Sequence, residues 1–349
     1  MKPQKILGNR LLVLGGYGVG NLGDEAILSS LIDNYIDANA VIVGSLSPKE
    51  TRKLHRIEAV HPLSLRFLWS LLSSDTIVIG GGGMFSRYTG ANARFIPLIG
   101  LLASLLGKKV HYTSIGAYGS TPDSVELLLK PSMRLASSIS VRDRASMRYL
   151  HSIGIECKLV DDLALSLQPA KSEVGKRQLK QLGIDLARPI LAIAPRMHIE
   201  PQHDKRTFLA LKKAIPRLAE RYQILMVPMA QIKYCKREND AIYINELVKD
   251  MDCPVFILEK QVHPRIMLSI FAQADIVIGV RLHSQIFSHI TRTPLIGISY
   301  AKKSKDFLET HGCFSLSTKT IKAQNILDAV NGLEGSGSRG KKPLKSSSA

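Results

Sequence analysis

The chain has 349 residues, 45% hydrophobic and 22% charged, which is the composition of a globular protein with room for two domains. Its 47 Lys and Arg residues outnumber its 29 Asp and Glu residues, and the net charge of +18 favours anionic partners. No basic run is interleaved with aromatic residues and no nucleic-acid-binding motif occurs, so we expect no nucleic-acid partner.

The sequence also lacks the patterns of export, of a membrane span and of a metal site. Its first ten residues are polar and basic, and its longest apolar segments, residues 63–72 and 95–107, are shorter than the ~20 residues that cross a bilayer. Four scattered cysteines without a CxxC pair indicate reduced thiols. We therefore expect a cytoplasmic protein without a metal or cofactor. The positive charge, Trp69 and residues 95–106 leave open a peripheral contact with an anionic inner membrane face.

In the first half, short apolar strands alternate with helices. The strands are predicted at residues 10–14, 41–44, 75–79, 108–115, 139–141 and 156–160. After the first strand, residues 15–26 read GGYGVGNLGDEA, and these glycines let the backbone approach a ligand closely. Asp24 and Glu25 then begin a helix, where their charge repels a pyrophosphate and suits a sugar hydroxyl. A capping role for Asp24 is the alternative.

Four consecutive glycines, residues 80–83, follow the strand at 75–79. Such a run raises the entropic cost of folding, so a structural or functional requirement must retain it. We interpret it as a place where a ligand approaches the backbone, in preference to a tight turn alone.

The alternation starts again in the second half. Residues 168–188 are polar and basic and are interpreted as a linker. Strands are predicted at residues 189–194, 223–227, 255–258, 276–280 and 295–299. This α/β pattern predicts two doubly wound Rossmann-like domains that face each other across a cleft. They comprise residues 1–167 and 189–334, and a Gly/Ser/Lys-rich tail, residues 335–349, is predicted to be disordered.

The strand at 276–280 is followed at once by Arg281 and His283. Ligands bind where a parallel strand passes into a helix, because free backbone N–H groups and the positive helix end point there. A guanidinium and an imidazole at this place suit a phosphate or a carboxylate. Arg196 follows the end of another strand in the same half, where it can flank the same ligand. In the alternative interpretation, Arg281 caps a surface loop and His283 is an ordinary residue of the first helical turn.

Four stretches together resemble the polysaccharide pyruvyl transferase family, in the order of that family. They are residues 18–26 (GVGNLGDEA), 79–83 (IGGGG), 140–143 (SVRD) and 280–283 (VRLH), the last with residues 297–300 (GISY) downstream. The resemblance implies a GT-B-like architecture, similar to that of inverting glycosyltransferases with two Rossmann domains. It also implies a donor, phosphoenolpyruvate, whose pyruvate is installed as a cyclic ketal across two hydroxyls of a sugar while phosphate is released.

The chain departs from the family pattern in two places. Residues 114–118 (SIGAY) replace a loop richer in glutamine and glycine, and residues 161–164 (DDLA) stand where Asp-Pro is common. These departures concern the acceptor more than the reaction.

The resemblance implies that Arg281 and His283 lie in the donor site, with Arg196 as a second arginine and with Leu282 and Ser284 beside His283. The chemistry of phosphoenolpyruvate agrees, because its phosphate and carboxylate suit two forked cations. Ketal formation adds a proton to the methylene carbon and removes protons from the acceptor hydroxyls, and one imidazole can serve both steps. We therefore expect His283 and Arg281 to be the catalytic residues.

The acceptor is expected to be a sugar or a lipid-linked glycan of polysaccharide or cell-wall biosynthesis, bound by the first half. The residues expected to line its site are Gly18, Asn21, Asp24, Glu25, Gly81, Gly82 and Gly83.

Two other functions stay open. A glycosyltransferase with a nucleotide-sugar donor would need a carboxylate for the ribose in the second half, for which Glu246 and Glu259 are candidates. A non-catalytic protein that binds anionic glycans or phospholipids would explain the charge and the apolar helices, but not His283 beside Arg281.

Overall fold

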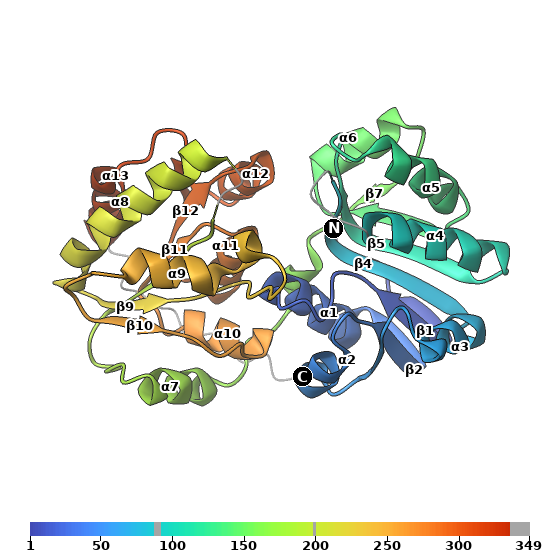
Figure 1. Cartoon of the computed structure of the whole chain (residues 1–349), viewed down its shortest axis with the longest axis horizontal. Coiled ribbons are helices and arrows are strands. Elements are labelled where there is room, and N and C mark those ends of the chain that lie inside the picture. Colours follow the sequence, from blue (N-terminus) through green and yellow to red (C-terminus); the bar gives the residue numbers. More distant parts are fainter. Residues whose placement is uncertain (87–91, 198–199, 336–349) are drawn as a thin grey trace. The chain divides into compact units, whose positions relative to one another are not determined.

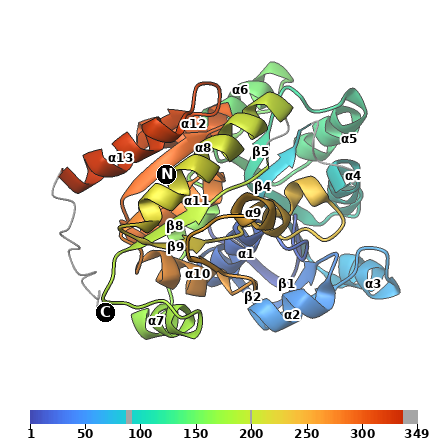
Figure 2. The same cartoon turned by 60° about the vertical axis from the view of Figure 1, so that its left-hand side comes forward.

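A computed structural model of the protein describes residues 1–86, 92–197 and 200–335 (Figure 1). The chain divides into two compact units. Unit 1 contains residues 1–167 and 262–264, and unit 2 contains the rest of the chain from residue 168 onward. Each unit is a parallel β-sheet with helices on both faces, as Figure 1 and Figure 2 show. The predicted class, two α/β domains with parallel sheets, is confirmed.

The elements of unit 1 alternate between strand and helix. They are β1 (Ile6–Leu14), α1 (Leu22–Asn34), β2 (Ile36–Gly44), α2 (Pro48–His55), β3 (Glu58–Val60), α3 (Leu65–Ser73), β4 (Thr76–Phe85), α4 (Asn92–Leu105), β5 (Lys109–Ala117), α5 (Asp123–Arg134), β6 (Ser138–Val141), α6 (Arg144–Ser152), β7 (Lys158–Leu159) and the 3-10 turn η1 (Leu163–Ser166). Among the described residues, the sheet has seven strands in the order β3-β2-β1-β4-β5-β6-β7.

Unit 2 repeats this plan. Its elements are α7 (Ser172–Gln181), β8 (Ile190–Ala194), α8 (Pro201–Ala219), β9 (Gln223–Met226), the 3-10 turn η2 (Lys236–Glu238), α9 (Asp240–Val248), β10 (Val255–Ile257), α10 (Pro264–Phe271), β11 (Ile276–Gly279), α11 (Leu282–Thr291), β12 (Leu295–Ser299), α12 (Lys302–Thr310), β13 (Phe314–Ser317) and α13 (Ala323–Gly335). The described part of this sheet has six strands in the order β10-β9-β8-β11-β12-β13.

In both sheets the strand order reverses once. The reversal lies between β1 and β4 in unit 1 and between β8 and β11 in unit 2. In doubly wound sheets, ligands bind outside the carboxyl ends of the two strands that flank this switch point. The two switch points are therefore the first places to look for a site.

The region expected to be a linker has a different structure. Residues 168–188 belong to unit 2 and contain helix α7. The helix is held against unit 2 at Gly175, whose backbone N–H donates to Ser269 Oγ at 3.2 Å, and a Cβ at Gly175 would lie only 2.5 Å from the Ser269 carbonyl oxygen. The polar composition of residues 168–188 gave no indication of this close contact. Of the predicted tail, residues 336–349 lie outside the described residues.

The glycine run at residues 80–83 is also not a loop, because β4 continues through it to Phe85. The close approach that these glycines permit is made by helix α1. A Cβ at Gly81 would lie 2.1 Å from Ile27 Cγ2, and Gly81 has a φ of +52°. Packing between α1 and β4 thus explains the buried part of the run without a ligand. Gly83 is half-buried.

Gly81→Ala tests this packing. We expect it to lower the free energy of unfolding by about 3 kcal/mol, because it combines a steric clash with a strained φ. Gly107→Ala is the matched control, since Gly107 has a φ of +75° but a Cβ added there would meet no atom within 4 Å. That control should lose only about 1 kcal/mol in urea unfolding. Equal losses in the two variants would contradict the packing explanation.

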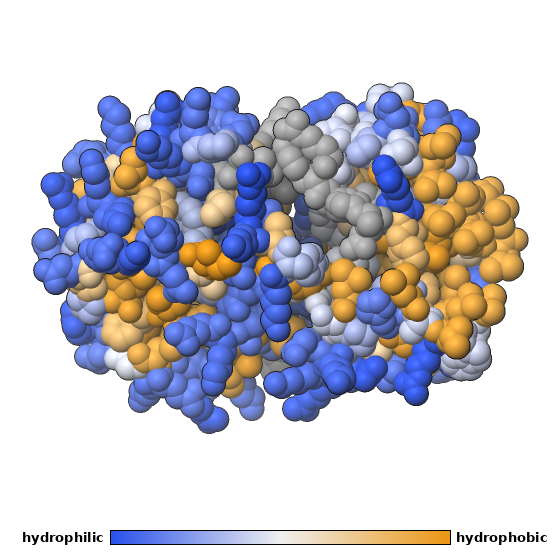
Figure 3. All heavy atoms as spheres, in the orientation of Figure 1, coloured by the Kyte–Doolittle hydropathy of each residue, from blue (hydrophilic) through white to orange (hydrophobic). Residues whose placement is uncertain are grey.

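The surface of unit 1 carries an unusual amount of apolar side chain. Figure 3 shows hydrophobic residues gathered at the edge of this unit where α3 and α4 lie. In the part of the chain that the structure describes, no helix combines the length and the apolar composition needed to span a membrane.

Candidate active site

The two arginines singled out in the sequence lie at the switch point of unit 2. β8 and β11 pair in parallel, with Ala194 opposite Gly279. Arg196 lies two residues after Ala194, and Arg281 lies two residues after Gly279. The strand register therefore places both arginines at the carboxyl edge of the sheet. The strands can end here because their buried residues are apolar and the first polar side chains come only after Pro195 and Val280.

Arg281 is buried and fully engaged by two carboxylates. Its Nε and Nη2 donate to the two oxygens of Asp240 at 2.7 and 2.8 Å, and its Nη1 donates to Glu238 Oε2 at 3.0 Å. The side chain of Asp240 is 0% exposed and also accepts from the backbone N–H groups of Met229 and Ala230. Burial acts to lower the pKa of Arg281, but Asp240 and Glu238 outweigh it and raise the pKa. The guanidinium is therefore charged and fixed in direction.

Arg196 contacts the same carboxylate, Glu238, and also Tyr300. Its Nη2 donates to Glu238 Oε1 at 2.8 Å and its Nη1 donates to the Tyr300 hydroxyl at 3.0 Å. The guanidinium carbon also lies 4.7 Å from the centre of the Tyr300 ring. Glu238 thus bridges both arginines, one oxygen to each. We name Arg196, Arg281, Glu238, Asp240 and Tyr300 the arginine cluster.

The arginine cluster brings together the two arginines expected from the sequence, but it also contains carboxylates that sequence reasoning missed. Glu238 lies in η2 and Asp240 begins α9, both after β9, the neighbour of β8 in the sheet. The signal that could have found them is two acids separated by one residue near a helix start, after a strand that borders the switch point.

His283 lies in the first turn of α11, two residues after Arg281, and is half-buried. The turn is fixed by Ser284, whose hydroxyl donates to the Arg281 carbonyl at 2.6 Å and whose side chain is fully buried. Ser284 was expected to contact the donor, but its side chain supports the backbone that carries Arg281. Leu282 is half-buried. His283 as a whole is thus only partly buried, although its Nε2 atom is itself buried.

The switch point of unit 1 carries Asp24, which is half-buried between the two glycine segments. A Cβ at Gly16 would lie 3.1 Å from Asp24 Oδ2, and one at Gly82 would lie 2.9 Å from Asp24 Oδ1. Asn21 is the N-cap of α1, accepting from the Gly23 N–H and donating to Asp24 Oδ2 at 2.7 Å. The alternative that Asp24 caps the helix is therefore wrong, and its carboxylate stands at the carboxyl ends of β1 and β4.

Glu25 does not share this position. Its side chain is only 3% exposed, and it accepts from the Gly18 N–H at 2.8 Å and from His55 Nε2 at 2.7 Å. His55 Nδ1 lies 3.2 Å from Ser29 Oγ, which in turn lies 3.1 Å from His263 Nε2. This buried network ties the glycine loop to α1, α2 and residues 262–264. The expectation that Glu25 lines an acceptor site is replaced by a role inside unit 1, which sequence spacing gave no means to foresee.

Glu25→Gln tests the network. We expect it to lower the free energy of unfolding by about 1–3 kcal/mol, because buried groups lose a charge-assisted partner. Glu50→Gln, at an exposed position on α2, is the control and should change it by less than about 0.5 kcal/mol in urea unfolding. The doubly substituted Glu25→Gln/His55→Gln protein should lose less than the sum of the single losses. Strictly additive losses would contradict a connected network.

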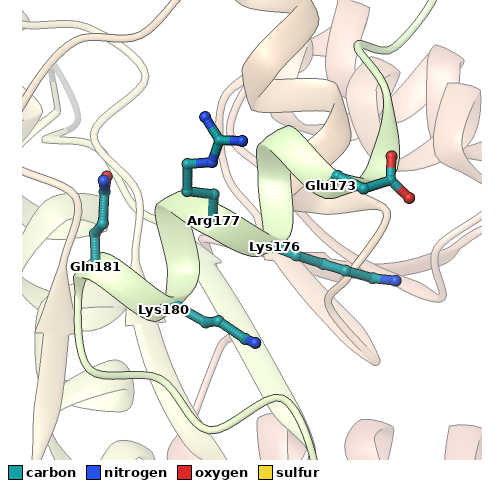
Figure 4. A pocket seen from close by; sticks show the side chains of 5 residues that line it. All are labelled: Glu173, Lys176, Arg177, Lys180 and Gln181. Atoms are coloured by element: carbon teal, nitrogen blue, oxygen red, sulfur yellow. The ribbon is translucent and has the colours of Figure 1, made fainter.

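A hollow along α7 lacks such convergence. Figure 4 shows this hollow, which is lined by Glu173, Lys176, Arg177, Lys180 and Gln181. All five side chains come from one helix, and the two lysines point away from Arg177 and Gln181. Within the described ranges, no group of three or more His, Cys, Asp or Glu side chains is arranged to hold a metal ion.

A sequence model of the polysaccharide pyruvyl transferase family matches residues 21–302. The chain belongs to this family. The match includes the Asn21–Asp24 segment and the whole arginine cluster with His283, and the resemblance seen in the motifs is thereby confirmed. No curated protein sequence matches the chain.

Solved structures with the same fold are distant in sequence. HepE of Anabaena, in complex with UDP-glucose, is 14% identical with a TM-score of 0.61, over 94% of this chain and 91% of that one. The UDP-GlcNAc 2-epimerase of Methanocaldococcus jannaschii is 15% identical with a TM-score of 0.61, over 92% of each chain. ADP-heptose LPS heptosyltransferase II of E. coli is 15% identical with a TM-score of 0.54, over 94% and 99%. These are GT-B proteins, so the likeness shows the fold of this family member.

Proposed function

We propose that the protein transfers the enolpyruvyl group of phosphoenolpyruvate to a sugar of a polysaccharide or glycan precursor as a cyclic ketal and releases phosphate. The observation that carries this proposal is the arginine cluster, in which two guanidiniums at one switch point converge on a single carboxylate. Phosphoenolpyruvate presents a carboxylate and a phosphate on neighbouring atoms, and forked cations bind both groups well.

Glu238 and Asp240 have different parts in this proposal. Asp240 is fully buried and anchored by backbone N–H groups, so it stays in place and orients Arg281. Glu238 is 33% exposed and lies on a short 3-10 turn, so solvent and ligands can reach it. We propose that an anionic group of the donor replaces the Glu238 carboxylate between the two arginines. The buried pair then remains neutral overall, and the donor gains two charged hydrogen-bond donors.

His283 is the proposed acid and base. A proton added to the methylene carbon of the donor makes C2 electrophilic, and the first sugar hydroxyl bonds to it. The C2–O bond to phosphate then breaks, and the second hydroxyl closes the ketal. The two hydroxyls release two protons, of which one balances the new methyl group and one leaves with hydrogen phosphate. An imidazole that gives one proton and takes another serves both halves of this sequence.

Asp24 is the proposed contact for the acceptor. It stands at the switch point of unit 1, where a carboxylate accepts hydrogen bonds from sugar hydroxyls. Gly18, Asn21 and the half-buried Gly83 stay proposed neighbours of the acceptor, whereas Glu25, Gly81 and Gly82 are buried inside unit 1.

The nucleotide-sugar alternative has less support. Its two candidate carboxylates are both exposed, Glu246 on α9 and Glu259 just after β10. The names of the structural neighbours mention UDP-sugars, but at 14–15% identity they bear on the fold only. The direct test of the proposal is phosphate release from phosphoenolpyruvate across a panel of sugar acceptors, with the ketal identified by mass spectrometry. Turnover of UDP-sugars with no release from phosphoenolpyruvate would overturn it.

Two matched amide substitutions test the displacement of Glu238. We expect Glu238→Gln to lower the KM for phosphoenolpyruvate about fivefold, because a competing carboxylate is removed from a partly exposed site. Asp240→Asn should raise the same KM more than about tenfold, because Arg281 loses the partner that orients it. Steady-state phosphate release measures both, with urea unfolding as the check on folding. A raised KM in Glu238→Gln would contradict the displacement.

His283→Gln tests the proton transfer. We expect kcat to fall by about 10²- to 10⁴-fold, with the affinity for phosphoenolpyruvate changed less than about threefold, because the loss affects chemistry and not binding. His289→Gln on the same helix is the control, since His289 is exposed and packs beside Phe307 and His311. Unchanged turnover in His283→Gln would remove His283 from the mechanism, and intact binding without turnover would argue against a protein that only binds.

A further inference from the structure

Two neighbouring helices of unit 1 expose apolar stripes. On α3 and the loop before it, the exposed residues are Leu63, Leu65, Leu68, Trp69 and Leu72, and on α4 and the loop after it they are Leu98, Leu102, Leu105 and Leu106. Leu65 is 86% exposed, Leu105 68% and Trp69 58%. We name these nine residues the α3–α4 surface. Single exposed leucines need no explanation, but a gathering of nine indicates an interaction site.

The two helices touch beneath the α3–α4 surface. The rings of Phe67 and Phe95 lie 5.8 Å apart, and Lys108 Nζ donates to the carbonyl oxygens of Leu72 and Ser74. Figure 3 shows the corresponding hydrophobic area at the edge of unit 1.

Helix α3 buries a polar residue and exposes several apolar ones. Its inner side buries Ser70 with Phe67 and Leu71, and Ser70 meets its hydrogen-bonding need by donating to the Arg66 carbonyl. Its outer side carries apolar residues at i, i+3, i+4 and i+7, from Leu65 to Leu72. A helix that only covers a core in water has the opposite pattern. The outer stripe of α3 is therefore apolar for a reason other than the packing of unit 1.

The charged residues beside this surface are mostly positive, although the exposed Asp75 follows α3, and Asp123 and Glu126 lie on α5, the helix that packs against α4. The sequence from Thr76 to Pro122 contains neither Asp nor Glu, and the exposed residues Arg66, Arg94 and Lys109 lie on or beside the two helices. The guanidinium of Arg10 lies 4.3 Å from the centre of the Trp69 ring. The nearest acid in sequence, Asp75, accepts hydrogen bonds from the backbone of Asn9 and Arg10.

We propose that the α3–α4 surface docks onto an anionic phospholipid bilayer. The leucines and Trp69 would enter the interfacial region, while the surrounding Arg and Lys residues meet lipid phosphates. Trp is well suited to this depth, because its ring is apolar and its N–H is polar. A second copy of the chain fits less well, because the charged residues beside the surface are mostly positive and two such faces repel each other. The proposal does not depend on the reaction assigned to the arginine cluster.

Trp69 is the only tryptophan in the chain, so its fluorescence reports on this surface alone. We expect its emission to shift to the blue when vesicles of phosphatidylcholine with about 30% phosphatidylglycerol are added, and to be quenched by brominated lipid. Pure phosphatidylcholine and about 0.5 M salt should both weaken the effect. An unchanged emission with anionic vesicles would overturn the proposal.

Vesicle flotation of the full chain gives the second test. Leu65→Ser/Leu105→Ser should bind anionic vesicles at least about tenfold more weakly, and it retains Trp69 as the reporter. Ile242→Ser/Phe314→Ser is the matched control in unit 2, where both residues are exposed, and it should bind like the wild-type chain. Equal binding by all three proteins would overturn the proposal. So would a dimer in sedimentation equilibrium without lipid that Leu65→Ser/Leu105→Ser abolishes, because the surface would then serve a second copy.

Discussion

The candidate site depends on a buried ion pair between Arg281 and Asp240. Removing a guanidinium from water is unfavourable unless the interior supplies opposite charge and hydrogen bonds in the right places. Asp240 supplies both with a two-point contact, and the backbone of residues 229 and 230 holds Asp240 in turn. This arrangement fixes the direction of Arg281 before any ligand arrives. It also leaves Glu238, on the solvent side, as the one bridging carboxylate of the cluster that a ligand can reach.

The two units share a sheet topology but carry side chains of opposite charge at their switch points. At the switch point of unit 2, guanidiniums follow paired strands, whereas at that of unit 1 a carboxylate stands between glycine segments. The difference arises from what packs against each strand end. In unit 1 the glycines of β4 admit helix α1 so closely that Asp24 reaches the edge of the sheet. This division suits an anionic donor in one unit and a hydroxyl-bearing acceptor in the other.

Much of the fold could be predicted from sequence, because buried parallel strands such as residues 276–279 form short apolar runs between helices. The arginines could be predicted for the same reason, since a residue that follows such a strand must lie at the edge of the sheet. Partners distant in sequence could not. Glu25 meets His55, Ser29 meets His263, and Arg281 meets Glu238 only after folding. The glycines of β4 were interpreted as a ligand contact, whereas they admit helix α1. Both explanations require a close approach to the backbone, so the sequence pattern does not distinguish them.

The central claim is that the arginine cluster binds a small anion with two neighbouring acidic groups. Titration calorimetry of the wild-type chain with phosphoenolpyruvate, UDP-glucose and UDP-GlcNAc tests it most directly, because it needs no acceptor and no turnover. The account predicts saturable binding of phosphoenolpyruvate at one site per chain and no heat of binding for either UDP-sugar. Saturable binding of a UDP-sugar with none of phosphoenolpyruvate would contradict it.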